Sequence, residues 1–177
     1  MERWQVITLG VATLLFAWFT WWSTLKDRRY HGSYRFFAFM TVVTLVVLDI
    51  PLWFHDPASP LQIAAWTLLA LAVYVVTHGV ILLKVRGKPR DGLEHSTELV
   101  SNGPYRFIRH PMYCSLFLMA VGLLLKSPTL VNALLLGVNL IAVVATAKGE
   151  ETEMLAEFGQ PYREYMARTK MIVPFVL

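Results

Sequence analysis

The side chains best suited to chemistry lie in a short polar segment, residues 97–113. His110 precedes Pro111, an order typical of a helix that begins at the proline. The free N–H groups and the dipole of a helix N-terminus favour an anion such as a carboxylate. Arg106 and Arg109 add positive charge to the same segment. The pattern therefore predicts an anion-binding site, although arginines at the end of a membrane helix also serve as ordinary interface anchors.

A second polar segment opens with two neighbouring carboxylates, Glu150 and Glu151, directly after a long apolar run. They could form the solvated acidic first turn of a helix, which the helix dipole would favour. One of them could instead turn toward the apolar helices and meet a cationic group, such as a sulfonium or an ammonium. The pattern leaves both interpretations open. The sequence has no cluster of Cys and His residues with the spacing of metal ligands, so we expect no metal site.

Apolar helices must position these two segments. Hydrophobic residues make up 56% of the 177 residues and charged residues only 16%, whereas soluble proteins average about 25% charged residues. Runs of about the length that crosses a bilayer are found at residues 4–25, 35–54, 61–83, 111–125 and 130–147. We predict an all-α membrane protein with about five transmembrane helices, of which the fourth is short for a full span.

The polar segments divide this single membrane domain into four parts. We expect three N-terminal spans in residues 1–83, a polar loop over 84–110, a helical hairpin over 111–147 and a polar tail over 148–177. Within the tail, the pattern predicts two short amphipathic helices, one over Glu150–Phe158 and one that opens at Pro161 and ends at Pro174. Gly159 would stop the first of them.

The distribution of positive charge predicts the orientation of the chain in the membrane. Of the 16 Lys and Arg residues, all but Arg3 and Lys126 lie within residues 26–35, 84–109 and 148–170. Cytosolic loops carry an excess of Lys and Arg, so the N-terminus is expected outside and the loop and tail in the cytosol. The net charge of +4 fits this topology and contact with lipid headgroups, and it does not indicate nucleic-acid binding.

Two ordered motifs flank the predicted hairpin. The first is Gly-x-Tyr-x-x-x-Arg-His-Pro-x-Tyr at residues 103–113, and the second, at residues 150–165, is Glu-Glu, six residues, then Phe-Gly-x-x-Tyr-x-x-Tyr. Together they resemble the isoprenylcysteine carboxyl methyltransferase family, and the related phospholipid N-methyltransferases share a looser version. The resemblance covers residues 99–174 and implies a cytosolic active site that binds S-adenosylmethionine.

The resemblance also implies which residues form that site. Those expected to bind the cofactor are Thr97, Glu98, Leu99, Val100, Tyr105, Arg109, His110, Pro111, Tyr113 and Glu150. Glu150 would meet the charged end of the cofactor. If the acceptor must lose a proton, a base is needed, and His110 and Glu151 are the catalytic candidates.

The acceptor is less closely specified than the cofactor. The resemblance implies a lipophilic small molecule or a lipid that reaches the site from the bilayer, such as an isoprenylcysteine carboxylate. The family carries an Arg one turn before the glutamates for the substrate carboxylate, whereas this chain has Thr146 there and Lys148 as the nearest cation. Thr146 and Lys148 are the substrate candidates, and a phospholipid amine or a small thiol is an alternative acceptor.

Two other functions fit parts of the pattern. A sterol-type reductase that uses NADPH has a similar C-terminal architecture, but the Glu150-Glu151 pair favours a methyltransferase. A membrane scaffold without enzymatic activity would need neither motif. His78 lies among apolar neighbours in the third run. An ionisable side chain inside a membrane is a functional candidate, although it could also bond a neighbouring carbonyl.

Overall fold

The computed structural model describes residues 2–27, 32–88 and 97–176. These residues form six α-helices and two short 3-10 helices: α1 (Arg3–Asp27), α2 (Gly32–Asp49), η1 (Ile50–Leu52), α3 (Pro60–Arg86), η2 (Gly103–Arg106), α4 (Pro111–Lys126), α5 (Leu130–Phe158) and α6 (Gln160–Arg168). Arg28, Arg29 and Arg90, which contribute to the predicted charge bias, lie outside the described residues.

The helices confirm an all-α membrane protein. Within the described residues, four helical segments are long and apolar enough to cross a membrane, namely Arg3–Trp21, Gly32–Leu52, Pro60–Arg86 and Leu130–Phe158. The fourth predicted run forms α4, which has only 16 residues. At 1.5 Å per residue it extends about 24 Å, less than the roughly 30 Å of a bilayer core. The predicted orientation of the chain stays a prediction.

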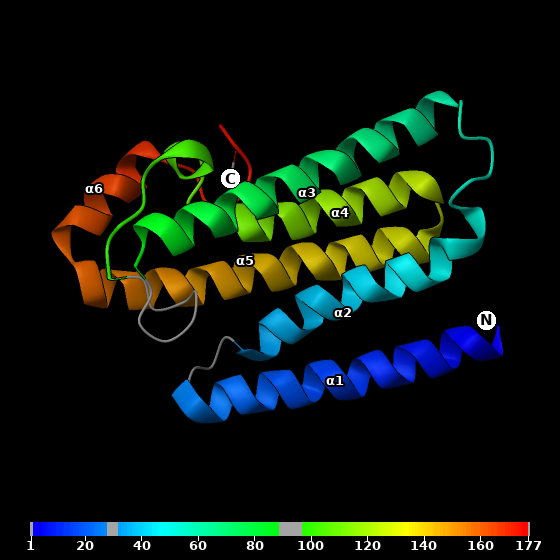
Figure 1. Ribbon diagram of the computed structural model, residues 1–177, viewed down its shortest axis with the longest axis horizontal. Coiled ribbons are helices and arrows are strands. Elements are labelled where there is room, and N and C mark those ends of the chain that lie inside the picture. The colour runs from blue at the N-terminus through cyan, green and yellow to red at the C-terminus, as the bar shows by residue number, and fades with distance from the viewer. Residues whose placement is uncertain (1, 28–31, 89–96, 177) are drawn as a thin grey trace. The chain divides into compact units, whose positions relative to one another are not determined.

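The described chain forms two compact units. Helices α3, α4 and α5 are each divided between the two units. Unit 1 lies within residues 1–70 and 116–146, and unit 2 lies within residues 71–115 and 147–177. In unit 1, α1 and α2 pack against each other in antiparallel directions (Figure 1). Unit 2 contains both polar segments singled out by their sequence.

Buried amides join the helices of unit 1. Asn139 Nδ2 lies 3.0 Å from both the carbonyl oxygen of Ala38 and Oγ1 of Thr41. Asn132 Nδ2 donates to Asp49 Oδ1 at 3.0 Å. Lipid offers little hydrophobic drive for helix association, so interhelical hydrogen bonds of this kind contribute to holding the unit together.

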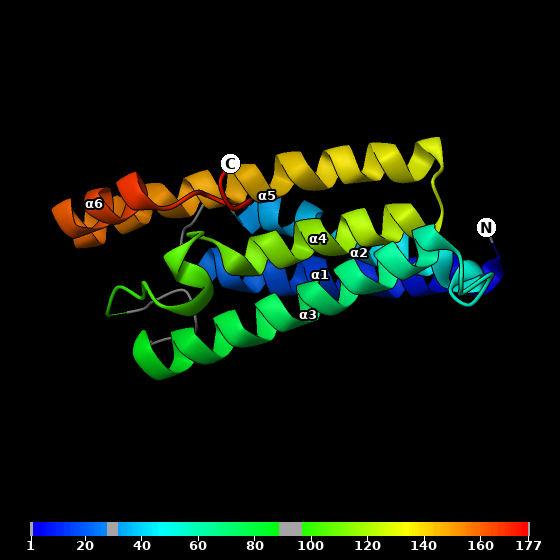
Figure 2. The ribbon, with the colours of Figure 1, turned by 90° about the horizontal axis from the view of Figure 1, so that it is seen from above.

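The tail differs from the predicted pair of short helices. Helix α5 continues without interruption to Phe158, so Glu150 and Glu151 project from a long helix rather than from a separate one. No proline interrupts residues 148–158, and the backbone hydrogen bonds therefore persist beyond the apolar run. Gly159, with φ +57°, ends the helix as predicted. After Gly159 the chain changes direction, and α6 leads away from the end of α5 (Figures 1 and 2). Helix α6 stops at Arg168, whereas the sequence predicted that it would end at Pro174.

A close approach in unit 1 gives a test of the helix packing. A Cβ at Gly122 would lie 3.2 Å from the carbonyl oxygen of Ala65 and 3.2 Å from Leu69, whereas a Cβ at Gly137 would meet nothing within 4 Å. Overpacking of this kind typically costs about 1–3 kcal/mol. We expect Gly122→Leu to lower the thermal unfolding midpoint in detergent and Gly137→Leu to leave it unchanged. Equal midpoints for the two variants would contradict the packing of α4 on α3.

Candidate functional site

The polar loop of unit 2 is seated on α3 through a tight turn. Gly103 has φ +58°, a backbone conformation that residues other than glycine rarely adopt. A Cβ there would lie only 2.6 Å from Cδ1 of Leu82. Pro104 follows in the first turn of η2, and Tyr105 is buried. The predicted Gly-Pro turn therefore brings Tyr105 under the loop.

The end of the chain pairs with this loop through its backbone. Ile108 and Lys170 form an isolated parallel β-bridge. The amide of Lys170 donates to the carbonyl oxygen of Phe107 at 3.0 Å, and the amide of Arg109 donates to that of Lys170 at 2.8 Å. The next amide, that of His110, donates to the carbonyl oxygen of Met171 at 3.0 Å. Two segments about 60 residues apart in the sequence are thus fixed next to each other.

The Arg109 side chain joins the loop, α5 and the tail. Its Nε donates to Glu151 Oε1 at 2.6 Å, and its terminal nitrogen donates to the carbonyl oxygens of Thr169 at 2.5 Å and Met166 at 3.3 Å. The side chains of Arg109 and Glu151 are each only 9% exposed. Since a charge buried to this degree needs a partner, each of the two residues holds the other in place.

His110 lies between the two carboxylates. Its Nδ1 is 3.4 Å from Glu150 Oε2, and its Nε2 is 3.5 Å from Glu151 Oε1. Burial by itself lowers the pKa of His110, but the interactions with Glu150 and Glu151 outweigh it and raise the pKa above the ordinary value. The hydroxyl of Tyr113 donates a hydrogen bond to Glu150 Oε1. The site thus concentrates two carboxylates, a guanidinium and an imidazole that favours its protonated form.

Buried tyrosines surround this group. Tyr162 and Tyr165 lie on the buried face of α6, as their spacing predicts, and the Tyr165 hydroxyl donates to the carbonyl oxygen of Tyr105 at 2.7 Å. Burial, followed by the charge of Glu150, raises the pKa of Tyr105. Burial, followed by the charge of Glu151, raises the pKa of Tyr162. Both hydroxyl groups therefore stay protonated and can donate hydrogen bonds.

Most of the predicted site residues meet in unit 2. Those placed around the charged group are Tyr105, Arg109, His110, Pro111, Tyr113, Glu150 and Glu151. The motifs did not indicate the part played by the carbonyl oxygens of Met166 and Thr169, because backbone acceptors leave no mark on the residue types. Both residues lie within about one helical turn of Tyr165, and this closeness to the tyrosines of α6 was the signal that the sequence offered.

The remaining predicted residues have other surroundings. The amide of Thr97 and its hydroxyl donate to the carbonyl oxygens of Gly87 and Lys88 at 2.8 and 3.0 Å. Glu98 forms an ion pair with Lys88 at 2.5 Å on the surface. Thr97 and Glu98 therefore cover the end of α3. Leu99 is half-buried and Val100 buried beside them.

The two substrate candidates differ from each other in environment. Thr146 is fully buried, and its hydroxyl donates to the carbonyl oxygen of Ala142 in its own helix at 2.8 Å. Lys148 is exposed. The position where the resemblance would place an arginine thus offers no cation.

Comparisons with known proteins agree with the two motifs. The profile of the phospholipid methyltransferase family matches residues 60–161. Methanethiol S-methyltransferase 1 of Bradyrhizobium diazoefficiens is 25% identical over 175 residues, which cover 88% of this chain and 59% of the relative. Methanethiol S-methyltransferase of Crocosphaera subtropica is 21% identical over 174 residues, which cover 88% of this chain and 66% of the relative. The chain thus spans less than two thirds of either relative. No solved structure matches it.

The contacts of Arg109 can be tested by proteolysis. Removing one partner of a buried ion pair costs about 3–5 kcal/mol, and Arg109→Gln would also lose the ionic hydrogen bonds to the tail. We expect Arg109→Gln to increase the rate of tryptic cleavage after Arg168 and Lys170 in detergent-solubilised protein. The matched variant Arg106→Gln, in which the replaced side chain is exposed, should be cleaved at the wild-type rate. Identical rates in both variants would show that Arg109 does not hold the tail.

Proposed function

The chain belongs to the phospholipid methyltransferase family, and we propose that it is a membrane enzyme that transfers a methyl group from S-adenosylmethionine to an acceptor that reaches the site from the bilayer. The observation that carries the proposal is the buried group formed by Arg109, His110, Glu150 and Glu151 in unit 2. The cofactor would supply an electrophilic methyl group on a sulfonium.

The chemistry of the site residues fits such a cofactor. It carries a carboxylate together with cationic groups, so a site for it must offer both signs of charge. Positive charge is available at the N-terminus of α4, and His110 lies directly before it, between the two carboxylates. Negative charge is available at Glu150. Glu151 is paired with Arg109. We assign the cationic end of the cofactor to Glu150, which also accepts the hydrogen bond of Tyr113 and lies 3.4 Å from His110.

The residues of the chain would act mainly by holding and orienting reactants. Positioning two reactants can contribute on the order of 7–11 kcal/mol to the lowering of a barrier. Arg109 would orient Glu151 and the tail, and Tyr113 would orient Glu150. His110 is held between the two carboxylates, which raise its pKa against the effect of burial. We therefore assign it an electrostatic role in binding and not the role of a base.

For the acceptor we propose a small thiol. The two relatives are named as methanethiol S-methyltransferases, and this is the specific observation that favours a thiol over a lipid. An isoprenylcysteine carboxylate is less well supported, because Thr146 supplies no cation for it. A small thiol dissolves in the bilayer and needs no charged anchor.

We also propose that the site faces the cytosol. The bias of Lys and Arg toward the loop and the tail supports this orientation. It would place the site where a water-soluble cofactor is available, while the acceptor enters from the lipid.

Binding of S-adenosylhomocysteine tests the cofactor assignment. We expect calorimetry on the purified protein in detergent to show micromolar affinity, and Glu150→Gln to weaken it by at least about tenfold, which corresponds to the roughly 1.4 kcal/mol of one lost charged contact. Glu157→Gln, which alters an exposed carboxylate on the same helix, should bind as the wild type does. Binding of NADPH in place of the adenosyl compound would favour the reductase alternative and overturn the proposal.

A further inference from the structure

A thiol acceptor requires a proton acceptor that the site as described does not supply. A thiol is a weak nucleophile until it loses its proton, because the thiolate is the reactive form. Within unit 2, Glu151 is paired with Arg109. Glu150 accepts a hydrogen bond from the hydroxyl of Tyr113 and lies 3.4 Å from His110. Both ring nitrogens of His110 face these carboxylates, at 3.4 and 3.5 Å. These groups are suited to binding and are poorly suited to accept the proton of a thiol.

His78 lies against the same loop from the side of α3. A Cβ placed on Gly103 would be 3.3 Å from His78 Nε2, so the imidazole lies close to the backbone of the turn. A Cβ on the neighbouring Gly79 would be 3.4 Å from Cγ of Pro111 and 3.9 Å from the Tyr105 hydroxyl. One turn of α3 thus contacts both the loop turn and the start of α4.

Tyr105 lies close to the residue that follows His78 in α3. Its hydroxyl lies near Gly79 on one side, and on the other it feels the charge of Glu150, which contributes to the raised pKa of Tyr105. The side chain of Tyr105 is buried. A protonated hydroxyl therefore lies close to the turn of α3 that carries His78.

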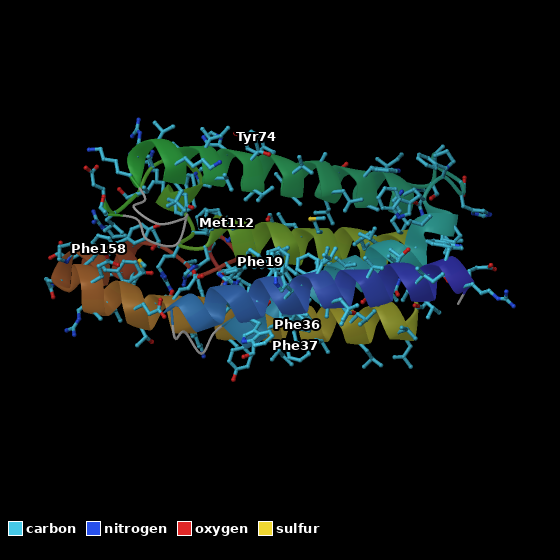
Figure 3. All side chains as sticks on the ribbon, turned by 60° about the horizontal axis from the view of Figure 1, so that its bottom comes forward. Phe19, Phe36, Phe37, Tyr74, Met112 and Phe158 are labelled. Carbon is cyan, nitrogen blue, oxygen red and sulfur yellow. The ribbon has the colours of Figure 1, made fainter. Side chains whose placement is uncertain are left out.

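His78 packs beside an exposed aromatic side chain of α3. His78 is half-buried, and its ring packs edge-on against Tyr74 with centroids 5.6 Å apart. Tyr74, which is labelled on α3 in Figure 3, is 60% exposed. In this proposal an uncharged acceptor dissolved in the bilayer would approach His78 along this face.

We propose that His78 is the catalytic base that deprotonates the thiol acceptor. This inference rests on the proposed function. The S–H bond of the acceptor breaks, its proton moves to a ring nitrogen of His78, and both bonding electrons stay on sulfur. The thiolate so formed is the nucleophile, and the proton passes from His78 to water before the next turnover.

The acidity of the acceptor tests the role of His78. A general base typically contributes about 10²–10⁴-fold to the rate. We expect His78→Gln to slow methyl transfer to ethanethiol by at least about 100-fold, and transfer to thiophenol, which is far more acidic and largely ionised at neutral pH, by less than about tenfold. His55→Gln, an exposed histidine of unit 1, should match the wild type with both thiols.

Two further measurements separate this role from a structural one. By calorimetry, His78→Gln should bind S-adenosylhomocysteine within about twofold of the wild type. Thiophenol added to the cofactor-free protein in a buffer more acidic than its own pKa should absorb as thiolate with the wild type and as neutral thiol with His78→Gln.

The outcomes distinguish this inference from the function on which it rests. An equal loss with both thiols, an unchanged rate with ethanethiol, or lost binding of S-adenosylhomocysteine in His78→Gln would overturn the role of His78 while leaving a wild-type methyltransferase. A wild-type protein that binds S-adenosylhomocysteine and methylates neither thiol would overturn the thiol acceptor, and His78 as its base with it.

Discussion

The site depends above all on the ion pair between Arg109 and Glu151. Both side chains are almost fully withdrawn from water, and neither charge could stay buried without the other. The guanidinium also donates hydrogen bonds to the carbonyl oxygens of Met166, in α6, and Thr169, directly after α6. One side chain thereby fixes the loop before α4, the polar end of α5 and the tail. Without it, these three segments would have no common charged partner.

Glu150 and Glu151 have different surroundings, because Arg109 is paired with Glu151. If Glu150 and Glu151 both faced an open site, their mutual repulsion would favour protonation of one of them. Arg109 satisfies Glu151, and His110 between the two completes a balance of opposite charges. Glu150 is oriented by the hydroxyl of Tyr113 and lies 3.4 Å from His110. In surroundings of low polarity, the charge of a carboxylate acts more strongly than it would in water.

The two units meet different physical demands. In unit 1, buried amides such as Asn139 bridge helices where lipid gives little drive for association. In unit 2, polar and charged groups are concentrated where helices α3 and α5 extend beyond the length that a bilayer core requires.

The sequence by itself determined the class of the protein, the apolar helices and the two motifs that form the site, because hydrophobic run length and charge are local properties. It also located the stop at Gly159, since a left-handed backbone favours glycine. It did not predict that α5 continues through Glu150, because helix formers permit either a break or an extension there. The sequence predicted Arg109 and Glu150 as cofactor-binding residues and Glu151 as a catalytic candidate, but it did not predict that Arg109 pairs with Glu151. Only the tertiary structure decided which side chain meets the tail, because backbone carbonyls such as that of Thr169 have no signature in sequence.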